Sequence, residues 1–438
     1  MPEPRAPVVI VGAGFSGTMT AANLARRGIR SILIEANGRA GQGAAYSTRE
    51  PAHLLNIRAQ NMGAWAEDPE HFASTLGLDR NSFAERRQFG RYLRSILDEA
   101  TEDGWVQVVE ERAVGARPVS QRWTVRLSGG GKIEADALVL ATGNQAPAKL
   151  PFADEAGDRL IDDPWGERAR SVVADAAQTG VDVLIVGTSL TMVDSVLSLD
   201  RAGYRGRIVA ISRRGKIPLP GGLHDPAPVD WEGAPSPKVR EIARWLRQRS
   251  REIDWRSAVD SLRPHSHRLW QSMPIPEKQL FLRYGRPWWD IHRHRIAPQV
   301  AARIEELISI GKLEVVAGRI IDVRRTADSV EVVYRKRGKS APDPARRFGY
   351  VFNCTGPLAD ITRTKDPLLR ALLDSRLVEP DELSIGLAVD ERSRAGPAGR
   401  LWALGTLTKG RYWEMIAVPD IRGQAAAVAE DIATELGQ

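Results

Sequence analysis

The sequence has a single cysteine, Cys354, in 438 residues. One cysteine cannot form an internal disulfide or a Cys-x-x-Cys redox pair, so the composition excludes a nucleotide-dependent reductase that works through a dithiol. Cys354 follows an apolar strand pattern, which predicts a small buried residue. We therefore assign it no catalytic role.

Long hydrophobic runs are also absent, since no apolar stretch approaches the roughly 20 residues that a membrane span needs. The first apolar run is short, lacks a small-residue cleavage site and predicts a strand rather than a signal peptide. We expect a cytoplasmic protein without membrane contacts. The length of 438 residues predicts two domains, or one domain with a large insertion.

Acidic residues are fewer than basic ones, and the formal net charge is therefore +7. The basic residues are scattered, apart from a run at residues 335–339, so we expect no nucleic-acid partner. The histidines within residues 265–294 lack carboxylate or thiolate partners at ligand spacing, so no metal site is predicted. We expect this charge to attract the phosphates of cofactors.

The N-terminal pattern predicts a nucleotide-binding unit. An apolar strand at residues 8–11 leads into Gly12-x-Gly14-x-x-Gly17, and a helical run follows. The first glycine permits a tight turn, the second lets the backbone approach a pyrophosphate, and the third lets the helix pack on the strand. Glu35 ends the next apolar strand, where its carboxylate can accept hydrogen bonds from ribose hydroxyls.

Three later features predict groups close to the same ligand. A glycine-rich segment at residues 38–43 precedes Asn56, and the two form either a loop against the ligand or a surface connection. A buried strand ends in Thr142-Gly143, at the sheet edge where nucleotides bind. Pro419 opens the last predicted helix, whose first amides are free to face an anion or a flavin carbonyl.

A second, incomplete copy of the glycine pattern lies in the middle of the chain. The apolar strand at residues 181–186 leads into Gly187-Thr188-Ser189. Ser189 stands in the place of the second glycine and Met192 in the place of the third. The added side chain predicts looser or shifted nucleotide binding. The alternative is a degenerate Rossmann unit that is kept for packing.

The strand after this second turn ends in Arg213 and Arg214, where the first unit has an acid. A guanidinium suits a ribose 2′-phosphate, because it donates several hydrogen bonds and is always charged. The pattern therefore favours NADP(H) over NAD(H) at this site.

The segment at residues 216–300 interrupts the pattern with prolines, tryptophans, arginines and histidines. Helices are predicted at 238–250 and 298–310. One interpretation is a cap over the active site, whose arginines hold an acidic group of the substrate. The other is an amphipathic helical insertion whose tryptophans form a small core of their own. Under the first interpretation the candidate substrate contacts are Arg263, Trp270, Trp289 and His292.

Short alternating segments at residues 105–139 and 313–334 predict antiparallel meanders. The first includes Val106 and Val108 as its opening strand. After the second meander, an apolar strand at residues 348–353 leads into a Cys-Thr-Gly turn, the counterpart of the strand that ends in Thr142-Gly143.

Taken together, these motifs resemble the two-dinucleotide-binding-domain flavoproteins. Within that group, residues 190–194, 212–215, 292–295 and 421–424 are most similar to the FAD/NAD(P)-binding proteins of the YdhS type, which are related to flavin-containing monooxygenases. The resemblance implies an α/β fold with two Rossmann-like domains, β-meanders and a helical insertion.

The resemblance also implies a division of the chain and a set of cofactor contacts. Residues 1–160 and 345–438 would form a discontinuous FAD-binding domain, and residues 165–344 an NAD(P)-binding domain. The implied FAD contacts are Gly12, Gly14, Phe15, Ser16, Gly17, Glu35, Ala36, Asn56, Ala141, Thr142, Gly143, Gly405, Pro419 and Ile421. The implied NADP(H) contacts are Gly187, Thr188, Ser189, Arg213 and Arg214.

The leading functional hypothesis is a single-component monooxygenase. NADPH would reduce FAD, and a flavin C4a-hydroperoxide would oxygenate a nucleophilic nitrogen or sulfur of a small-molecule substrate. Two alternatives stay open, an NAD(P)H-dependent flavin reductase that serves a quinone or protein acceptor and a non-catalytic redox sensor. The sequence names no substrate and no catalytic residue, and it is compatible with a homodimer.

Overall fold

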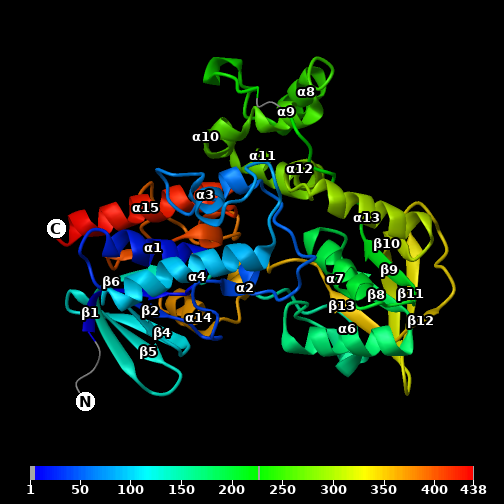
Figure 1. Cartoon of the computed structure of the whole chain (residues 1–438), viewed down its shortest axis with the longest axis horizontal. Coiled ribbons are helices and arrows are strands. Elements are labelled where there is room, and N and C mark those ends of the chain that lie inside the picture. Colours follow the sequence, from blue (N-terminus) through cyan, green and yellow to red (C-terminus); the bar gives the residue numbers. More distant parts are fainter. Residues whose placement is uncertain (1–4, 225–226, 438) are drawn as a thin grey trace.

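The computed structural model describes residues 5–224 and 227–437, which fold around two β-sheets (Figure 1). Each sheet has seven strands within the described residues. The two sheets and their helices form two lobes along the long axis of the molecule, and helices of residues 239–293 stand above them in this view.

The first sheet has a parallel core, in which β2 and β6 pair with β1 from either side. β6 carries antiparallel β5 on its N-terminal half and parallel β14 on its C-terminal half. The core strands are apolar throughout because both faces of the sheet are covered. The strands are β1 (Arg5–Val11), β2 (Ser31–Ile34), β3 (Val106–Val109), β4 (Ala113–Val119), β5 (Arg122–Leu127), β6 (Lys132–Leu140) and β14 (Leu401–Ala403).

One face of the first sheet packs against α1 (Phe15–Ala25), α4 (Arg86–Glu102) and α15 (Val418–Glu435). α4 begins with a capping box between Glu85 and Gln88 and buries an apolar stripe. The opposite face packs against α14 (Pro367–Asp374). Shorter elements of this lobe are α2 (Gly43–Tyr46), η1 (Ala59–Asn61), α3 (His71–Leu76), η6 (Ile361–Arg363) and η7 (Gly405–Thr408).

The second sheet repeats this plan in the order β12-β11-β10-β9-β8-β13-β7. β9 and β13 flank β8 in parallel, as β2 and β6 flank β1. Its strands are β7 (Leu160–Ile161), β8 (Val183–Val186), β9 (Ile208–Ser212), β10 (Leu313–Arg325), β11 (Val330–Lys336), β12 (Arg346–Phe348) and β13 (Tyr350–Asn353). Its helices are α5 (Ala153–Ala156), η2 (Gly157–Arg159), α6 (Glu167–Thr179), α7 (Leu190–Arg201) and α13 (Pro298–Ser309).

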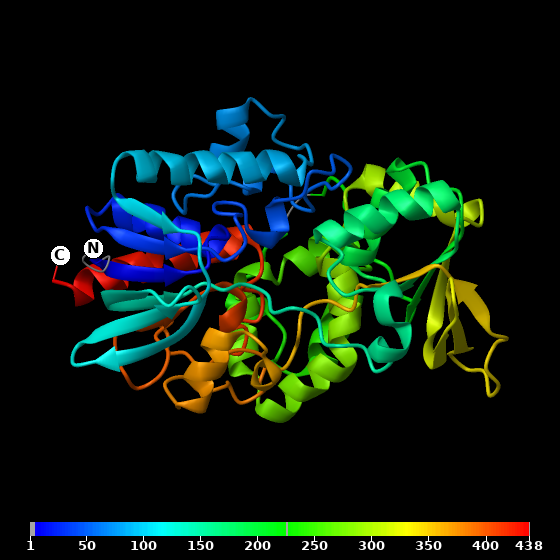
Figure 2. The same cartoon turned by 90° about the horizontal axis from the view of Figure 1, so that it is seen from below.

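A helical insertion lies between β9 and α13. Seen from below, it lies beside the C-terminal part of the chain (Figure 2). α8 and α13 confirm the helices predicted at 238–250 and 298–310. The insertion contains η3 (Trp231–Gly233), α8 (Val239–Arg249), α9 (Trp255–Asp260), η4 (Arg263–His265), α10 (Ser266–Ser272), α11 (Ile275–Leu280), the π-helical η5 (Phe281–Gly285) and α12 (Arg286–Arg293).

One strand prediction is wrong, and a second strand is interrupted. β3, which contains Val106 and Val108, pairs in parallel with β2 and is no part of the first meander. The strand predicted at 348–353 is divided at Gly349 into β12 and β13, and both lie in the second sheet. The chain therefore leaves the second sheet after Asn353.

The predicted fold class is confirmed: the chain is α/β, with two Rossmann-like sheets, meanders and a helical insertion. Among the helices of the described residues, none has the length and apolar character that crossing a membrane requires.

Candidate functional site

The first glycine turn lies against the end of β6. Gly12 has a φ of +106°, and a Cβ there would lie 2.3 Å from the carbonyl oxygen of Ala141. A Cβ on Gly17 would lie 1.9 Å from the carbonyl oxygen of Gly12. Neither position can hold a larger residue without moving backbone, so the geometry requires both glycines.

Gly14 is the N-cap of α1 and has space beside it. A Cβ there would meet only the Cα of Gly43, at 3.7 Å. No side chain caps α1, and its first turn has no acidic residue. The free amides and the positive end of the helix dipole are therefore left for an anion.

Glu35 lies beside this turn and is buried. One carboxylate oxygen accepts a hydrogen bond from the amide of Ala13 at 3.3 Å, and the other accepts from the amide of Asn37 at 2.8 Å. The backbone thus fixes the carboxylate at the end of β2. An ionised carboxylate has about four acceptor sites, so it can also receive ribose hydroxyls.

Two unpaired hydroxyl groups lie at the carboxyl ends of β6 and β14. The hydroxyl oxygens of Thr142 and Thr406 are buried and have no hydrogen-bond partner among the described residues. A buried hydroxyl without a partner is costly, and a polar ligand would remove that cost. These hydroxyls fit a cofactor with polar edges.

The chain around Gly405 brings distant segments to this edge. Gly405 has a φ of +61°, and a Cβ there would lie 2.8 Å from the hydroxyl of Ser16 and 3.9 Å from Ile421. Its amide donates to the side chain of Gln424 at 2.8 Å. Pro419 stands in the first turn of α15. The structure therefore gathers Ser16, Gly405 and Ile421 in one place.

The remaining residues predicted to contact FAD are less closely gathered. Phe15 is buried in the core of the first lobe, Gly143 has a φ of +70°, and Ala36 is exposed. Asn56 lines a cavity of about 10 Å³ together with Arg86 and Asp194. That cavity lies where the two lobes meet, because Asp194 belongs to α7.

The second glycine turn has the same geometry as the first. Gly187 has a φ of +114°, and a Cβ there would lie 2.1 Å from the carbonyl oxygen of Cys354. Thr188 bonds with its hydroxyl to Ser212 at 2.8 Å. Ser189 is exposed at the start of α7, whereas Met192 is fully buried in the core. The serine thus points away from the packed side of the turn.

Basic residues follow at the end of β9. Arg213 is exposed, and Arg214 donates with Nη2 to the carbonyl of Arg283 in the insertion at 3.0 Å. Nη1 of Arg214 is buried and has no hydrogen-bond partner in the described residues. A guanidinium with a free buried donor fits a phosphate.

The insertion is attached to the loop after β14 by buried polar contacts. Glu414 accepts hydrogen bonds from Trp289 Nε1 at 2.8 Å and from Arg293 Nε at 3.0 Å. Burial alone would raise the pKa of Glu414, but Arg293, His294 and the Trp289 bond together lower it below its usual value. Glu414 therefore stays ionised and holds α12 in place.

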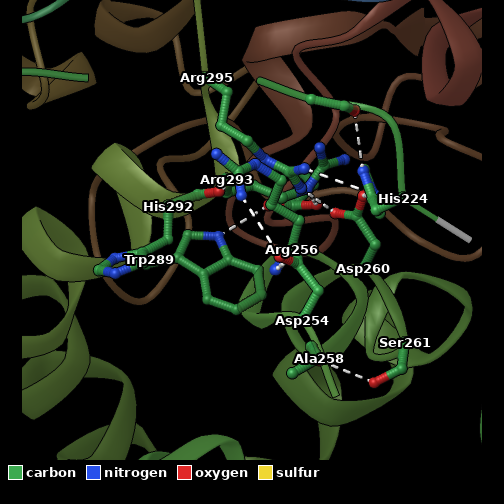
Figure 3. A network of polar contacts seen from close by, with 12 residues as sticks. His224, Asp254, Arg256, Ala258, Asp260, Ser261, Trp289, His292, Arg293 and Arg295 are labelled. Carbon is green, nitrogen blue, oxygen red and sulfur yellow. Dashed lines mark hydrogen bonds and ion pairs between the residues drawn. The ribbon is translucent and has the colours of Figure 1, made fainter. Parts of the chain in front are cut away.

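A second set of contacts lies next to this one. Arg295 and His224 both bond to Asp260, with His224 Nε2 at 2.7 Å (Figure 3). Arg263 lies 3.9 Å from Asp420, in the first turn of α15. Burial raises the pKa of Asp420, and the charge of Arg263 opposes this rise.

Three of the four predicted substrate residues lie close to residues 410–420. Trp270 donates to the carbonyl of Gly410 at 2.8 Å and stacks on Trp413. Arg263 and Trp289 reach Asp420 and Glu414, as described above. His292 instead bonds to the carbonyl of Trp288 and packs edge-on against Trp255 within the insertion. The tryptophans of the insertion thus pack partly on the first lobe.

Two charged groups were not predicted from the sequence. Lys409, in the loop after β14, has no hydrogen bond or ion pair within the described residues, and burial lowers its pKa to about 8. Asp194 of α7 forms a buried ion pair with Arg86 at 3.0 Å, and its carbonyl lies 3.0 Å from His53 Nε2. The latter contacts join the two lobes. No local pattern marks such long-range partners.

Two Rossmann sheets in one chain, each with a glycine turn after its central strand, define the fold of the two-dinucleotide-binding-domain flavoproteins. Residues 9–145 match a family model described as FAD-NAD(P)-binding. The first lobe therefore carries an FAD/NAD(P)-binding domain, and the predicted resemblance to this superfamily is confirmed.

Solved structures share the fold over nearly the whole chain. Ornithine hydroxylase (PvdA) from Pseudomonas aeruginosa is 14% identical, with a TM-score of 0.68 over 99% of this chain and 100% of that one. L-lysine 6-monooxygenase from Pseudomonas syringae is 16% identical, with a TM-score of 0.68 over 98% and 99%. Bacillithiol disulfide reductase from Staphylococcus aureus is 14% identical, with a TM-score of 0.60 over 98% and 99%. A comparison with curated proteins finds no match.

Proposed function

We propose that the protein is an FAD-dependent, NADPH-using oxidoreductase, and that it acts as a single-component monooxygenase on a nucleophilic nitrogen or sulfur of a small molecule. The proposal places FAD at the first glycine turn and NADPH at the second. When bound, the flavin supplies the redox and oxygen chemistry. The protein supplies binding, orientation and exclusion of water.

The first turn offers the groups that FAD requires. The free amides of α1 beside Gly14 would hold the pyrophosphate, and Glu35 would accept hydrogen bonds from the ribose. The buried hydroxyls of Thr142 and Thr406 would pair with polar groups of the cofactor. Each of these protein groups has unused hydrogen-bonding capacity, which supports the assignment.

The second turn supports NADPH. Its glycine and the start of α7 repeat the geometry of the first turn, and the exposed Ser189 leaves room for a ligand. Under the proposal, Arg213 and Arg214 would contact the ribose 2′-phosphate, because they follow the second strand of this Rossmann unit. Their charge favours NADPH over NADH.

The single buried cysteine is the observation that argues against disulfide reduction, one of the reactions found on this fold. The structures that share this fold include hydroxylating monooxygenases and disulfide reductases. Disulfide reduction through a dithiol needs two thiols, whereas this chain has only Cys354. Burial raises the pKa of that thiol to about 12 and removes it from thiolate chemistry. Oxygenation needs no thiol.

The substrate region is proposed to lie between the insertion and residues 409–420. Lys409 and Arg263 offer positive charge there, which suits a substrate that carries an acidic group. The aromatic wall of Trp270 and Trp413 would contact its apolar part.

The test measures NADPH oxidation, oxygen uptake and oxygenated product together, for a panel of amino acids, amines and thioethers. The proposal expects at least one compound to accelerate NADPH oxidation and to give nearly one oxygenated product per NADPH. Acceleration by quinones without oxygenated product would favour an electron-transferring reductase. A bound flavin that NADPH does not reduce would favour a redox sensor.

Cofactor choice is tested by Arg213→Ala combined with Arg214→Ala. Loss of charged hydrogen bonds to the 2′-phosphate should weaken NADPH by roughly 10-fold to 100-fold and leave NADH nearly unchanged. Arg240→Ala with Arg251→Ala makes the same charge change on exposed residues of the insertion and serves as the control. Equal loss for NADPH and NADH would contradict the assignment.

A further inference from the structure

A basic and aromatic surface continues from the second glycine turn into the insertion. We call it the β9 patch and define it by Arg213, Arg214, Lys216, Arg283, Tyr284, Trp288 and Arg337. Thr188 of the turn donates its hydroxyl to the carbonyl of Lys216 at 2.5 Å, so the patch is attached directly to the proposed nucleotide turn.

Specific contacts join the two sides of the patch. Arg214, after β9, donates to the carbonyl of Arg283 in η5 at 3.0 Å. The ammonium of Lys216 lies 3.1 Å from the centre of the Trp288 ring in α12. The end of β9 and the helix formed by η5 and α12 therefore face one another at close range.

The patch collects positive charge without an acidic partner. Among the described residues, Lys216 and the four arginines of the patch form no ion pair; Arg214 instead bonds to a backbone carbonyl, and Lys216 lies over an aromatic ring. Burial lowers the pKa of Lys216, and the nearby charges of Arg214 and Arg337 lower it further. Like charges held together are unfavourable unless an anion joins them.

Two large aromatic side chains are exposed beside these charges. Tyr284 is 50% exposed and Trp288 is 55% exposed, and they stand one helical turn apart. Tyr284 lies in the π-helical η5, and Trp288 follows it in α12. A π-helical turn is a local irregularity that occurs frequently at functional sites. Exposed aromatic faces next to cations suit a ligand with a flat ring and a phosphate.

We propose that the β9 patch binds the adenosine 2′-phosphate end of NADPH, with Trp288 and Tyr284 against the adenine and Lys216 beside Arg213 and Arg214 at the phosphate. This inference rests on the proposed NADPH site at the second glycine turn. It adds that the helical insertion is part of the cofactor site. The insertion would then contact both NADPH and, through Glu414, the first lobe.

The position of the patch favours a dinucleotide over other anions. In a Rossmann unit, the residues after the second strand lie at the ribose of the adenosine. β9 is that strand here, and the patch begins one residue after its end at Ser212. The aromatic pair adds an apolar surface beside these residues, which would suit an adenine ring.

The test uses adenosine 2′,5′-bisphosphate and 5′-AMP as probes, because neither requires flavin chemistry. Calorimetric titration of the purified holoprotein should give a measurable affinity for the bisphosphate. Trp288→Ala should weaken both probes by about 5-fold to 100-fold, through loss of stacking on the base. Lys216→Gln should weaken the bisphosphate more than 5′-AMP, because only the bisphosphate has the 2′-phosphate.

Trp245→Ala is the matched control, since it removes a tryptophan from α8 in the same insertion and should leave both affinities unchanged. Trp288→Phe should restore most of the lost affinity, which a misfolded protein would not do. If the wild type binds the bisphosphate and Trp288→Ala and Tyr284→Ala bind it equally well, the role of the insertion is refuted. If the wild type does not bind it, the proposed NADPH site fails as well.

Discussion

The buried ion pair between Glu414 and Arg293 gives the sharpest stability prediction. The two side chains are 4% and 10% exposed, and Arg293 Nε lies 3.0 Å from the carboxylate. Glu414→Gln keeps the shape and an acceptor for Trp289 but removes the charge. It leaves Arg293 buried without its hydrogen-bonded counter-ion, with only the charges of Asp260 and Asp420 in its surroundings. We therefore expect a loss of about 3 kcal/mol in the free energy of unfolding.

The measurement is urea unfolding near neutral pH, with linear extrapolation and comparison of slopes. Glu67→Gln is the control, because Glu67 pairs with Arg26 at 2.6 Å although their side chains are 64% and 49% exposed. An exposed pair should cost only about 0–1 kcal/mol. Equal losses in the two variants would refute the argument that burial decides the effect. The rate of amide hydrogen exchange in α12 should also rise in Glu414→Gln and stay unchanged in Glu67→Gln.

Of three further predictions, two concern the first lobe and its edge, and the third concerns the core of the second lobe. Gly14→Val should give a protein without bound flavin, because the side chain would occupy the space of the pyrophosphate, while Gly131→Val should purify yellow. Burial lowers the pKa of Lys409 from 10.5 to about 8. Its buried charge therefore destabilises the folded protein fully below pH 8, and this cost disappears above pH 10.5, the pKa of the lysine in the unfolded chain. Lys409→Met should therefore gain about 3 kcal/mol near neutral pH and little above pH 10.5; a gain independent of pH would contradict this. Cys354 should resist iodoacetamide at mildly alkaline pH until the protein is unfolded, and rapid labelling of the folded protein would show the thiol to be accessible.

Local sequence was sufficient to predict the two glycine turns. Gly12 and Gly187 have positive φ values and lie against the strands that end at Leu140 and Asn353, as the repeated strand-turn-helix pattern implies. Buried parallel strands carry a continuous apolar pattern, so their existence was also predictable. The pairing of these strands was not predictable from the sequence. β3 has the alternation of a hairpin strand, but its partner is decided by the crossover through α4.

The contacts that join the first lobe to the insertion and to the second lobe were beyond prediction for a different reason. Arg293 and Glu414 stand 121 positions apart, and His53 and Asp194 stand 141 apart. Each side chain alone has the pattern of an ordinary polar residue, and only the packed fold shows that it is buried with a partner. Lys409 is the reverse case, since its lack of a partner appears only when its surroundings are known.

The most direct test of the central claim is anaerobic mixing of the purified protein with NADPH or NADH while the flavin absorbance is followed. We expect the protein to retain FAD, and NADPH to bleach the flavin much faster than NADH does, because the arginines after β9 favour the 2′-phosphate. A protein that contains no flavin after supplementation with FAD, or a bound flavin that neither nucleotide reduces, would contradict the account.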